Sequence, residues 1–405
     1  KKKTRFVDEE KCTGCGLCQE KCPIKIPDEY NAGTVVTKNV RIPFPQAVPL
    51  VAVMDKEKCL YHKKGVCRLC EKACGAGAID FEQEDREFDI DVGSIIVATG
   101  FTPFDPTNQT ELGYHHPDVL TSLEFERYLS ASGPTGGHVK KPSDGTTPRK
   151  IAFIQCVGSR NPHINRNLCS SVCCMMTTKE AIIAKEHDPD IEPYMFYMDV
   201  RACGKAFNEF YERGKNEFGI TYVRSRIGAI RIDPRTEGLS LKYEDLDTGK
   251  IRTMDFDMVV LGTGLNPTPN ISRLAETLSL EIDDFGYLRT SLDRPLETNR
   301  PGIFVAGVSQ GPKDIPETVA QASGAAAKAG AAISEARGEL VSSKERPPEK
   351  DVSGKPRIGV FVCHCGINIG SVVNVPGVAE YAKTLDNVVH AAETIYACSS
   401  DHQLK

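Results

Sequence analysis

The stretch Cys12-Thr-Gly-Cys15-Gly-Leu-Cys18-Gln-Glu-Lys-Cys22-Pro23 decides how the first part of the chain folds. Its spacing is C-x2-C-x2-C-x3-C-P, which gathers three thiolates in one tight loop and carries the fourth away from it. Three thiolates at this spacing can hold three corners of an iron–sulfur cube, and the fourth usually ligates a second cube. The stretch therefore predicts two [4Fe–4S] clusters that exchange their last ligands.

A second run of cysteines, spaced C-x7-C-x2-C-x3-C, supplies the other ligands. We assign one cluster to Cys12, Cys15, Cys18 and Cys74. The other takes Cys59, Cys67, Cys70 and Cys22. Zinc is the alternative, but zinc sites pair two C-x2-C units and do not need this triple spacing. The runs resemble those of bacterial two-cluster ferredoxins, so residues 1–90 are expected to form an α+β ferredoxin domain. Near its end, the alternation in Phe88-Asp-Ile-Asp-Val92 predicts a short strand.

Composition limits the remaining possibilities. A chain of 405 residues is long enough for two or more domains. Its net charge of −5 does not indicate a surface that binds nucleic acid. No apolar run approaches the length of a membrane span. The sixteen cysteines are clustered at metal-ligand spacings, which points to a reducing, cytoplasmic location. Because the chain opens at Lys1 without Met, we expect a fragment of a longer protein.

Two glycine turns organise the rest of the chain. Short apolar runs end at Thr99-Gly100 and at Gly262-Thr-Gly264, and each indicates a buried parallel strand followed by a tight turn. The turns resemble those of flavoproteins with two dinucleotide-binding domains, such as thioredoxin reductase. The resemblance predicts an FAD domain in two parts, 91–147 and 263–337, around a Rossmann-like unit at 148–262.

That unit opens with a strand over residues 150–156, after which a nucleotide-binding domain should carry G-x-G-x-x-G. Instead the sequence reads Cys156-Val-Gly-Ser-Arg160, and then Cys169-Ser-Ser-Val-Cys173-Cys174. The residues alone leave two interpretations, a cluster site and buried structural thiols. The N-terminus of the following helix is expected to favour thiolates over thiols.

The pattern C-V-G-S-R followed by C-S-x-V-C-C resembles the flavin-carrying A subunit of heterodisulfide reductase. That resemblance covers nearly the whole chain. It implies a thioredoxin-reductase-like flavoprotein with an inserted ferredoxin domain, FAD, and three or more [4Fe–4S] clusters. The third cluster would be held by Cys156, Cys169, Cys173 and Cys174.

The flavin half closes with Ala306-Gly307-Val-Ser-Gln310-Gly-Pro-Lys-Asp314-Ile315-Pro316, a strand end, a turn and a helix start. A helix N-terminus directed at the flavin would stabilise its anionic reduced form. Val308 stands where most flavin disulfide reductases have Asp. No G-x-G-x-x-G for the adenosine half of FAD precedes the cysteine runs, so we expect that motif before this chain. The resemblance implies flavin contacts at Thr99, Gly100, Gly264, Gly307, Gln310, Asp314 and Ile315.

Residues 338–356 are charged and Pro-rich and are predicted to be a linker. Residues 357–405 resemble the start of the N-terminal domain of the same kind of subunit, as in a tandem or fused form. Two interpretations remain for Cys363, Cys365 and Cys398. One is a further cluster, and the other is an incomplete, metal-free site.

The resemblance also implies the function. The protein would move electrons between FAD and [4Fe–4S] clusters in flavin-based electron bifurcation. The implied partners are HdrB- and HdrC-like subunits, a hydrogenase- or dehydrogenase-type donor, and ferredoxin. One alternative is an NAD(P)H-dependent ferredoxin-type reductase like the small subunit of glutamate synthase, which needs the missing glycine loop. The other is a non-catalytic electron carrier.

Overall fold

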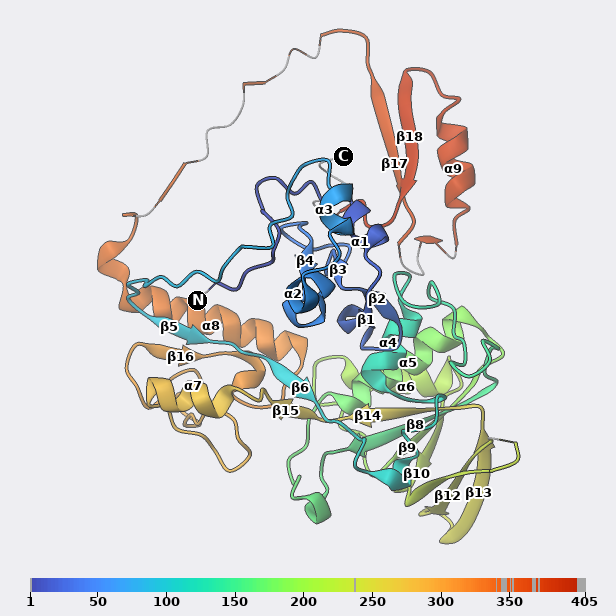
Figure 1. Cartoon of the computed structure of the whole chain (residues 1–405). Helices are drawn as coiled ribbons and strands as arrows, with labels where there is room; N and C mark the ends of the chain where they lie inside the picture. The colour runs from blue at the N-terminus through green and yellow to red at the C-terminus, as the bar shows by residue number, and fades with distance from the viewer. Residues whose placement is uncertain are drawn as a thin grey trace. The chain divides into compact units, whose positions relative to one another are not determined.

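The computed structural model describes residues 2–236, 238–339, 341–343, 348–349, 351, 353–365, 369–370 and 372–398. The chain divides into two compact units. One comprises Lys1–Ile90, Ser130–Gly137 and Glu345–Lys405. The other comprises Asp91–Leu129 and His138–Lys344. Figure 1 labels most of the helices and strands of the two units.

Short elements form the cysteine-rich part of the first unit. Its three helices are α1 (Leu17–Lys21), α2 (Leu60–Lys64) and α3 (Leu69–Ala73). Two antiparallel strand pairs accompany them, β1 (Lys25–Pro27) with β2 (Val36–Lys38) and β3 (Val40–Arg41) with β4 (Val53–Met54). Two 3-10 turns cover Glu29–Asn31 and Lys56–Lys58. With so little regular structure, the core is small, and buried cysteines contribute to it directly.

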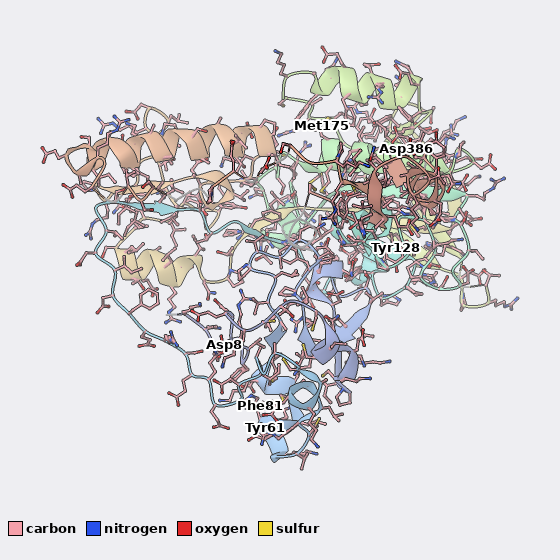
Figure 2. The ribbon with its side chains drawn as sticks, turned by 90° about the horizontal axis from the view of Figure 1, so that it is seen from above. Asp8, Tyr61, Phe81, Tyr128, Met175 and Asp386 are labelled. Carbon is pink, nitrogen blue, oxygen red and sulfur yellow. The ribbon has the colours of Figure 1, made fainter. Side chains whose placement is uncertain are left out.

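Aromatic packing supports the second cysteine run. Tyr61 and Phe81 lie side by side (Figure 2), and their ring centroids are 4.2 Å apart. The Arg68 guanidinium lies over both rings, within cation–π distance. This stack fixes α2 beside the loop that carries Cys67.

The strand predicted at residues 88–92 is wrong, because these residues have no ladder partner among the described residues. Phe88, Ile90 and Val92 are 58%, 68% and 59% exposed. Alternation marks a strand only when a neighbouring strand supplies the hydrogen bonds and a core receives the apolar face.

The second unit is built around a five-stranded parallel sheet in the order β10-β9-β8-β14-β7. Its strands are β7 (Val119–Thr121), β8 (Lys150–Val157), β9 (Glu192–Tyr197), β10 (Thr221–Arg224) and β14 (Met258–Thr263). Helices α4 (Ser122–Leu129), α5 (Cys173–His187) and α6 (Phe207–Asn216) share one core with the sheet. An antiparallel meander forms the other core, with strands β11 (Ala229–Ile232), β12 (Leu239–Asp245) and β13 (Lys250–Phe256).

Alternation along β8 explains how both cores form. Ile151 and Phe153 belong to the helical core, and Ala152 and Ile154 belong to the meander core. A strand buried on both faces reads as a continuous apolar run, as β8 and β14 do. The sheet is therefore a rigid base for whatever lies at its carboxyl edge.

A smaller part of the second unit pairs β5 (Ile95–Val97) in parallel with β16 (Ile303–Val305). A second pair, β6 (Phe101–Pro103) with β15 (Leu265–Pro267), is antiparallel. Helices α7 (Ile271–Leu278) and α8 (Ile315–Ala332) complete it. Short 3-10 turns lie at Thr110–Leu112, Pro162–Ile164, Gly307–Ser309 and Ser334–Ala336.

Helix α8 starts where its sequence dictates. Asp314 accepts a hydrogen bond from the Glu317 N–H, and the Glu317 carboxylate accepts one from the Asp314 N–H, which completes a capping box. Pro316 occupies the first turn, where its missing N–H costs nothing. The Ala-rich helix is mostly exposed and buries only Ala325 and Ala329.

The last described segment pairs β17 (Ile358–Cys363) in parallel with β18 (Val388–Thr394), and α9 (Val375–Ala382) packs against both. Asn374 caps α9 by accepting a hydrogen bond from the Gly377 N–H. No helix among the described residues has the length and apolar composition needed to cross a membrane.

Phe153→Ala should lower the free energy of unfolding by about 3–5 kcal/mol, because it leaves a cavity in a closed core. Phe153 is fully buried and packs edge-on against Phe125, with ring centroids 5.6 Å apart. Urea unfolding followed by circular dichroism measures the change. Phe88→Ala is the matched control and should cost about 0.5 kcal/mol or less. Equal losses for both variants would contradict the two assigned environments.

Candidate metal and flavin centres

The first predicted cluster set converges in the structure. Burial raises the pKa of Cys18 to about 11, and thiolate charge at neighbouring cysteines acts in the same direction. Those neighbours are Cys12, Cys15 and Cys74. Cys18 lies inside α1, and Cys74 ends α3, where the Ala78 N–H donates to its Sγ at 3.3 Å. Three cysteines of the first run and the last cysteine of the second thus face one another.

In the second set, Cys22 and Cys59 lie near Cys70. Burial raises the pKa of Cys70 to about 12, and the nearby cysteines Cys22, Cys59 and Cys18 raise it as well. Cys22 ends α1, just as Cys74 ends α3. Cys67 has a positive φ of 78° and lies in the loop just before α3. Because α1 packs against α3, each helix delivers its final cysteine to the other set.

The spacing of these thiols bears on which metal they suit. No disulfide joins any of the sixteen cysteines, all of which the structure describes. No group of three or more His, Cys, Asp or Glu side chains among the described residues is arranged to hold a single metal ion. A zinc ion needs all its ligands about 2.3 Å from one point, whereas a cube binds each thiolate at a different iron. The triple spacing of each cysteine run is what favours a cluster over one ion.

The third set lies at the carboxyl edge of the parallel sheet. Cys156 is near the end of β8 and has a φ of 61°, a left-handed conformation that non-glycine residues rarely adopt. Cys173 and Cys174 open α5, and Cys169 lies in the loop before it. Among the neighbours that raise the pKa of Cys173 are Cys156, Cys174 and Cys169, so all four thiols lie close together. Strained backbone of this kind is typical of functional sites.

Two charged side chains frame this set. The Arg160 guanidinium forms a two-pronged ion pair with the Asp199 carboxylate. Both charges act on Cys156 and Cys174. The Cys173 Sγ donates to the Thr263 carbonyl at 3.6 Å, and the Cys174 Sγ donates to the Asp199 carbonyl at 3.8 Å. The sequence prediction missed Asp199, and its position just after β9 was the available signal.

Burial opposes the effect expected of the helix N-terminus on these cysteines. Burial raises the pKa of Cys156 to about 11, even though Arg160 lowers it. Burial also raises the pKa of Cys173 and Cys174. Desolvation outweighs the helix dipole because the dipole is worth about 1 kcal/mol, whereas burying a charge costs more. These thiols are neutral until a metal replaces their protons.

The phosphate loop of a nucleotide-binding domain is absent from this edge of the sheet. In that motif a helix follows the strand after a short glycine turn. Here β8 ends at Val157 and α5 begins only at Cys173, with a 3-10 turn between them. A cavity of about 450 Å³ lies beside Cys156, and Gln155, Ser225 and Arg226 line it.

Four of the predicted flavin contacts, Thr99, Gly100, Gly307 and Gln310, lie at the carboxyl ends of β5 and β16. The Thr99 N–H donates to the Ser309 Oγ at 2.7 Å, which ties the two strand ends together. The Gly307 N–H donates to the Gln321 Oε1 at 3.0 Å. Gly100 has a φ of 76°, and a Cβ there would meet no atom within 4 Å. Parallel strand ends with open glycine turns are where α/β folds bind ligands, so these residues fit one side of a flavin site.

A buried lysine, Lys313, holds the turn before α8. Its Nζ donates to the carbonyls of Gly307 and Gly311 and to the Gln310 Oε1. Burial lowers its pKa to about 8. The sequence prediction missed Lys313 as well, and no spacing rule would have found it. Asp314 caps α8 and Ile315 is 79% exposed, so neither is tied to the Lys313 network.

Gly264 lies apart from those strand ends, next to the third cysteine set. A Cβ on Gly264 would lie 2.3 Å from the Ser159 Oγ and 2.7 Å from the Ser170 Oγ. Both serines belong to the loop between β8 and α5. Gly264 therefore lets the cysteine loop approach the start of the second flavin part. A cavity of about 310 Å³ at this junction is lined by Gly158, Ser170 and Tyr287.

The three cysteines near the C-terminus also come together. The Sγ atoms of Cys363 and Cys365 are 2.9 Å apart, and Cys398 acts on Cys365. His364 pairs with Glu393 at 3.1 Å. Their convergence is compatible with both interpretations that the sequence left open.

Two family models match stretches of this chain. A family model described as "4Fe-4S binding domain" matches residues 5–28. A second, "Pyridine nucleotide-disulphide oxidoreductase", matches residues 192–326. The first identifies a [4Fe–4S] site and the second an FAD-type redox domain. The predicted combination of a ferredoxin domain with an α/β flavoprotein fold is confirmed.

Curated relatives narrow the class of flavoprotein that this chain resembles. The A subunit of "H(2):CoB-CoM heterodisulfide,ferredoxin reductase" from Methanothermobacter thermautotrophicus is 46% identical over 369 residues, 90% of this chain and 55% of the relative. The iron-sulfur A subunit of "CoB--CoM heterodisulfide reductase" from Methanocaldococcus jannaschii is 43% identical, over 89% of this chain and 55% of the relative. About nine tenths of this chain is thus similar to heterodisulfide reductase A subunits, at 43–46% identity. It spans about half the length of the curated relatives it matches.

Among solved structures, thioredoxin reductase of Lactococcus lactis in its FR conformation has 17% identity and a TM-score of 0.41. The match covers 73% of this chain and 86% of that one.

Cys15→Ser and Cys70→Ser should each remove the EPR signal of one ferredoxin cluster and leave most of the other. The reason is that Cys15 and Cys70 contribute to different sets. Iron analysis and EPR of the reduced full-length protein measure the outcome, and Cys203→Ser, at an exposed thiol, is the control. Unchanged iron in both variants would refute the ligand assignment.

In the iron-free protein, Cys156 should resist alkylation at pH 8. A thiol with a pKa of about 11 has on the order of a thousandth of its population as thiolate at that pH. Labelling should therefore rise tenfold per pH unit toward pH 11, as iodoacetamide and mass spectrometry can show. Exposed Cys203 reports reagent access. Rapid labelling of Cys156 at pH 8 would mean that burial does not govern this thiol.

Proposed function

We propose that the protein is the iron–sulfur flavoprotein subunit of a heterodisulfide-reductase-like complex and moves electrons between FAD and [4Fe–4S] clusters. The observation that carries this proposal is the third cysteine set. Four thiols converge at the sheet edge where a nucleotide phosphate would otherwise bind. A domain that has exchanged its phosphate loop for thiols is suited to one-electron transfer and lacks the usual means to hold a pyridine nucleotide.

The proposed site residues follow the sequence prediction. Cys156, Cys169, Cys173 and Cys174 hold one cluster, and the two cysteine runs hold two more. A bound cluster would accept and release single electrons, and a bound flavin would exchange one or two. Side chains of this protein then set the charge and the solvent access around the cysteines. Arg160 places positive charge beside the thiols, and burial excludes water from Cys173.

The flavin is proposed to lie against the ends of β5 and β16. Thr99, Gly100, Gly307 and Gln310 lie at those ends, Asp314 and Ile315 follow them, and Gly264 lies near the cysteine loop. The Lys313 ammonium adds positive charge to the turn before α8. Positive charge and a helix N-terminus both favour the electron-rich reduced flavin.

The proposed domain order is a ferredoxin domain at 1–90, flavin parts at 91–147 and 263–337, and the thiol-bearing unit at 148–262. A linker at 338–356 and the start of a further domain at 357–405 follow. The names of the relatives include CoB–CoM heterodisulfide and ferredoxin as reactants. We extend this to the present protein as flavin-based bifurcation with HdrB- and HdrC-like subunits, a hydrogenase- or dehydrogenase-type donor and ferredoxin.

The test is Cys173→Ala in the full-length protein. Iron should fall by about one cube of four, flavin content should stay unchanged, and electron transfer from flavin to the ferredoxin clusters should slow. Stopped-flow absorbance and iron analysis measure these quantities. Cys203→Ala is the control, since that thiol is exposed and belongs to no set. Unchanged iron with unchanged transfer would reduce the third set to core packing.

A further inference from the structure

Glu180 is a buried acid that no function described above uses. It lies in α5 with no exposed surface, and neither carboxylate oxygen has a hydrogen-bond partner within the described structure. Burial raises its pKa well above the usual value. An unsatisfied buried carboxyl is costly, and in a native fold such a group usually serves a purpose.

The helix places Glu180 in line with the third cysteine set. Cys173, Thr177 and Glu180 follow one another at steps of four and three residues, so they share one face of α5. All three are buried, and the Thr177 Oγ1 donates to the Cys173 carbonyl at 2.9 Å. Seven residues of helix correspond to about 10 Å along the axis.

A second polar side chain joins this line from the sheet. Gln155 immediately precedes Cys156, and its Nε2 donates to the Thr177 Oγ1 and, at 3.0 Å, to the Met195 Sδ. Its buried Oε1 has no partner in the described structure. A Cβ at position 262 would lie 3.2 Å from the Thr177 Cγ2 and 3.5 Å from the Gln155 Oε1, so glycine at this position leaves room for these two side chains. A polar row thus interrupts an otherwise apolar core and leads from the cysteines toward Glu180.

Within the described structure, no cation is hydrogen-bonded to the Glu180 carboxylate. Strand β14 has no titratable residue, and β8 presents Ile151, Phe153 and Gln155. The Glu126 carboxylate on α4 raises the pKa of Glu180, and the ammonium of Lys179, the preceding residue on α5, lowers it. Lys179 is itself hydrogen-bonded to Glu126.

Other titratable groups lie on the elements that pack against α5, and among them Tyr197 of β9 and Tyr211 of α6 pack against the Tyr222 ring. Glu124 accepts from Tyr114, and Tyr222 pairs with Thr178, while Tyr128 is a buried member of the shared core. The remaining charges on α6 are exposed: Glu209, Glu212, Arg213 and Lys215. Glu180 is therefore not half of a structural ion pair.

We propose that Glu180 is the proton-binding group coupled to reduction of the cluster held by Cys156, Cys169, Cys173 and Cys174, an inference that rests on the proposed function. When a one-electron donor such as reduced flavin adds an electron to the site, the Glu180 carboxylate takes up one proton from solvent and becomes neutral. On oxidation the electron and the proton both leave. Added negative charge about 10 Å away in a low-dielectric interior favours the neutral carboxyl.

The sign of the pH dependence follows. The pKa of Glu180 is higher when the cluster is reduced than when it is oxidised. Below both values the carboxyl stays neutral, and above both it stays ionised, so the cluster's midpoint potential is flat with pH. Between them the potential falls with rising pH by about 59 mV per unit, which is the tenfold change in proton concentration converted for one electron.

The experiment uses the full-length protein loaded with FAD and clusters. EPR-monitored redox titrations from pH 6 to 10 give the midpoint potential of the cluster that Cys173→Ala removes. Wild type should show a sloping segment, and Glu180→Gln, which keeps the side-chain shape but binds no proton, should be flat. Glu186→Gln, at a position farther along the same helix, should keep the wild-type slope.

The outcomes separate the two proposals. If Cys173→Ala removes no cluster signal, the proposed function fails and this inference fails with it. If the signal exists but the wild-type potential is flat, or Glu180→Gln keeps the slope, only the role of Glu180 is overturned.

A measurement on wild type needs no folded variant. Within the sloping pH range, the reduced-minus-oxidised infrared spectrum should show a gain in the C=O band of a buried protonated carboxyl. No such gain there would overturn the proposal.

Discussion

The pairing of β8 with β14 is the constraint on which the thiol site depends. The two strands run in parallel register from Ile151 opposite Met258 to Val157 opposite Thr263, with an irregularity between Leu261 and Thr263. At that point Cys156 adopts its left-handed backbone, and the Thr263 carbonyl accepts from Cys173. Such irregularities re-aim side chains at the ends of strands. Without this one, the β8 thiol would follow the ordinary alternation of its strand.

Burial then decides the chemistry of these thiols. Because desolvation keeps Cys156 and Cys173 protonated, iron can enter only as protons leave. Arg160 and Asp199 remain charged at the rim of the site, where solvent still reaches them. The site therefore combines a dry interior with a polar edge, and the dry interior strengthens every electrostatic effect within it.

Much of this arrangement could be predicted from spacing. The cysteine runs predicted two exchanged sets, and short apolar runs predicted β5, β8, β14 and β16. Spacing could not predict burial, which raises the pKa of Cys173 against the effect expected of the helix N-terminus. Alternation at residues 88–92 failed for lack of a partner strand. Glu180 gave no signal at all, because an acid within an amphipathic helix normally faces water, and only the packing of α4 and the sheet shows otherwise.

The exchange of Cys22 and Cys74 has a mechanical consequence. Each set draws ligands from both ends of the cysteine-rich segment, so a bound cluster would act as a covalent staple across a long loop. Closing a long loop removes conformational entropy from the unfolded chain, as a disulfide does. Two interlocked staples would compensate for a core too small to be stable by itself. In this segment the same clusters would carry electrons and stabilise the fold. Loss of iron would therefore weaken electron transfer and the fold together.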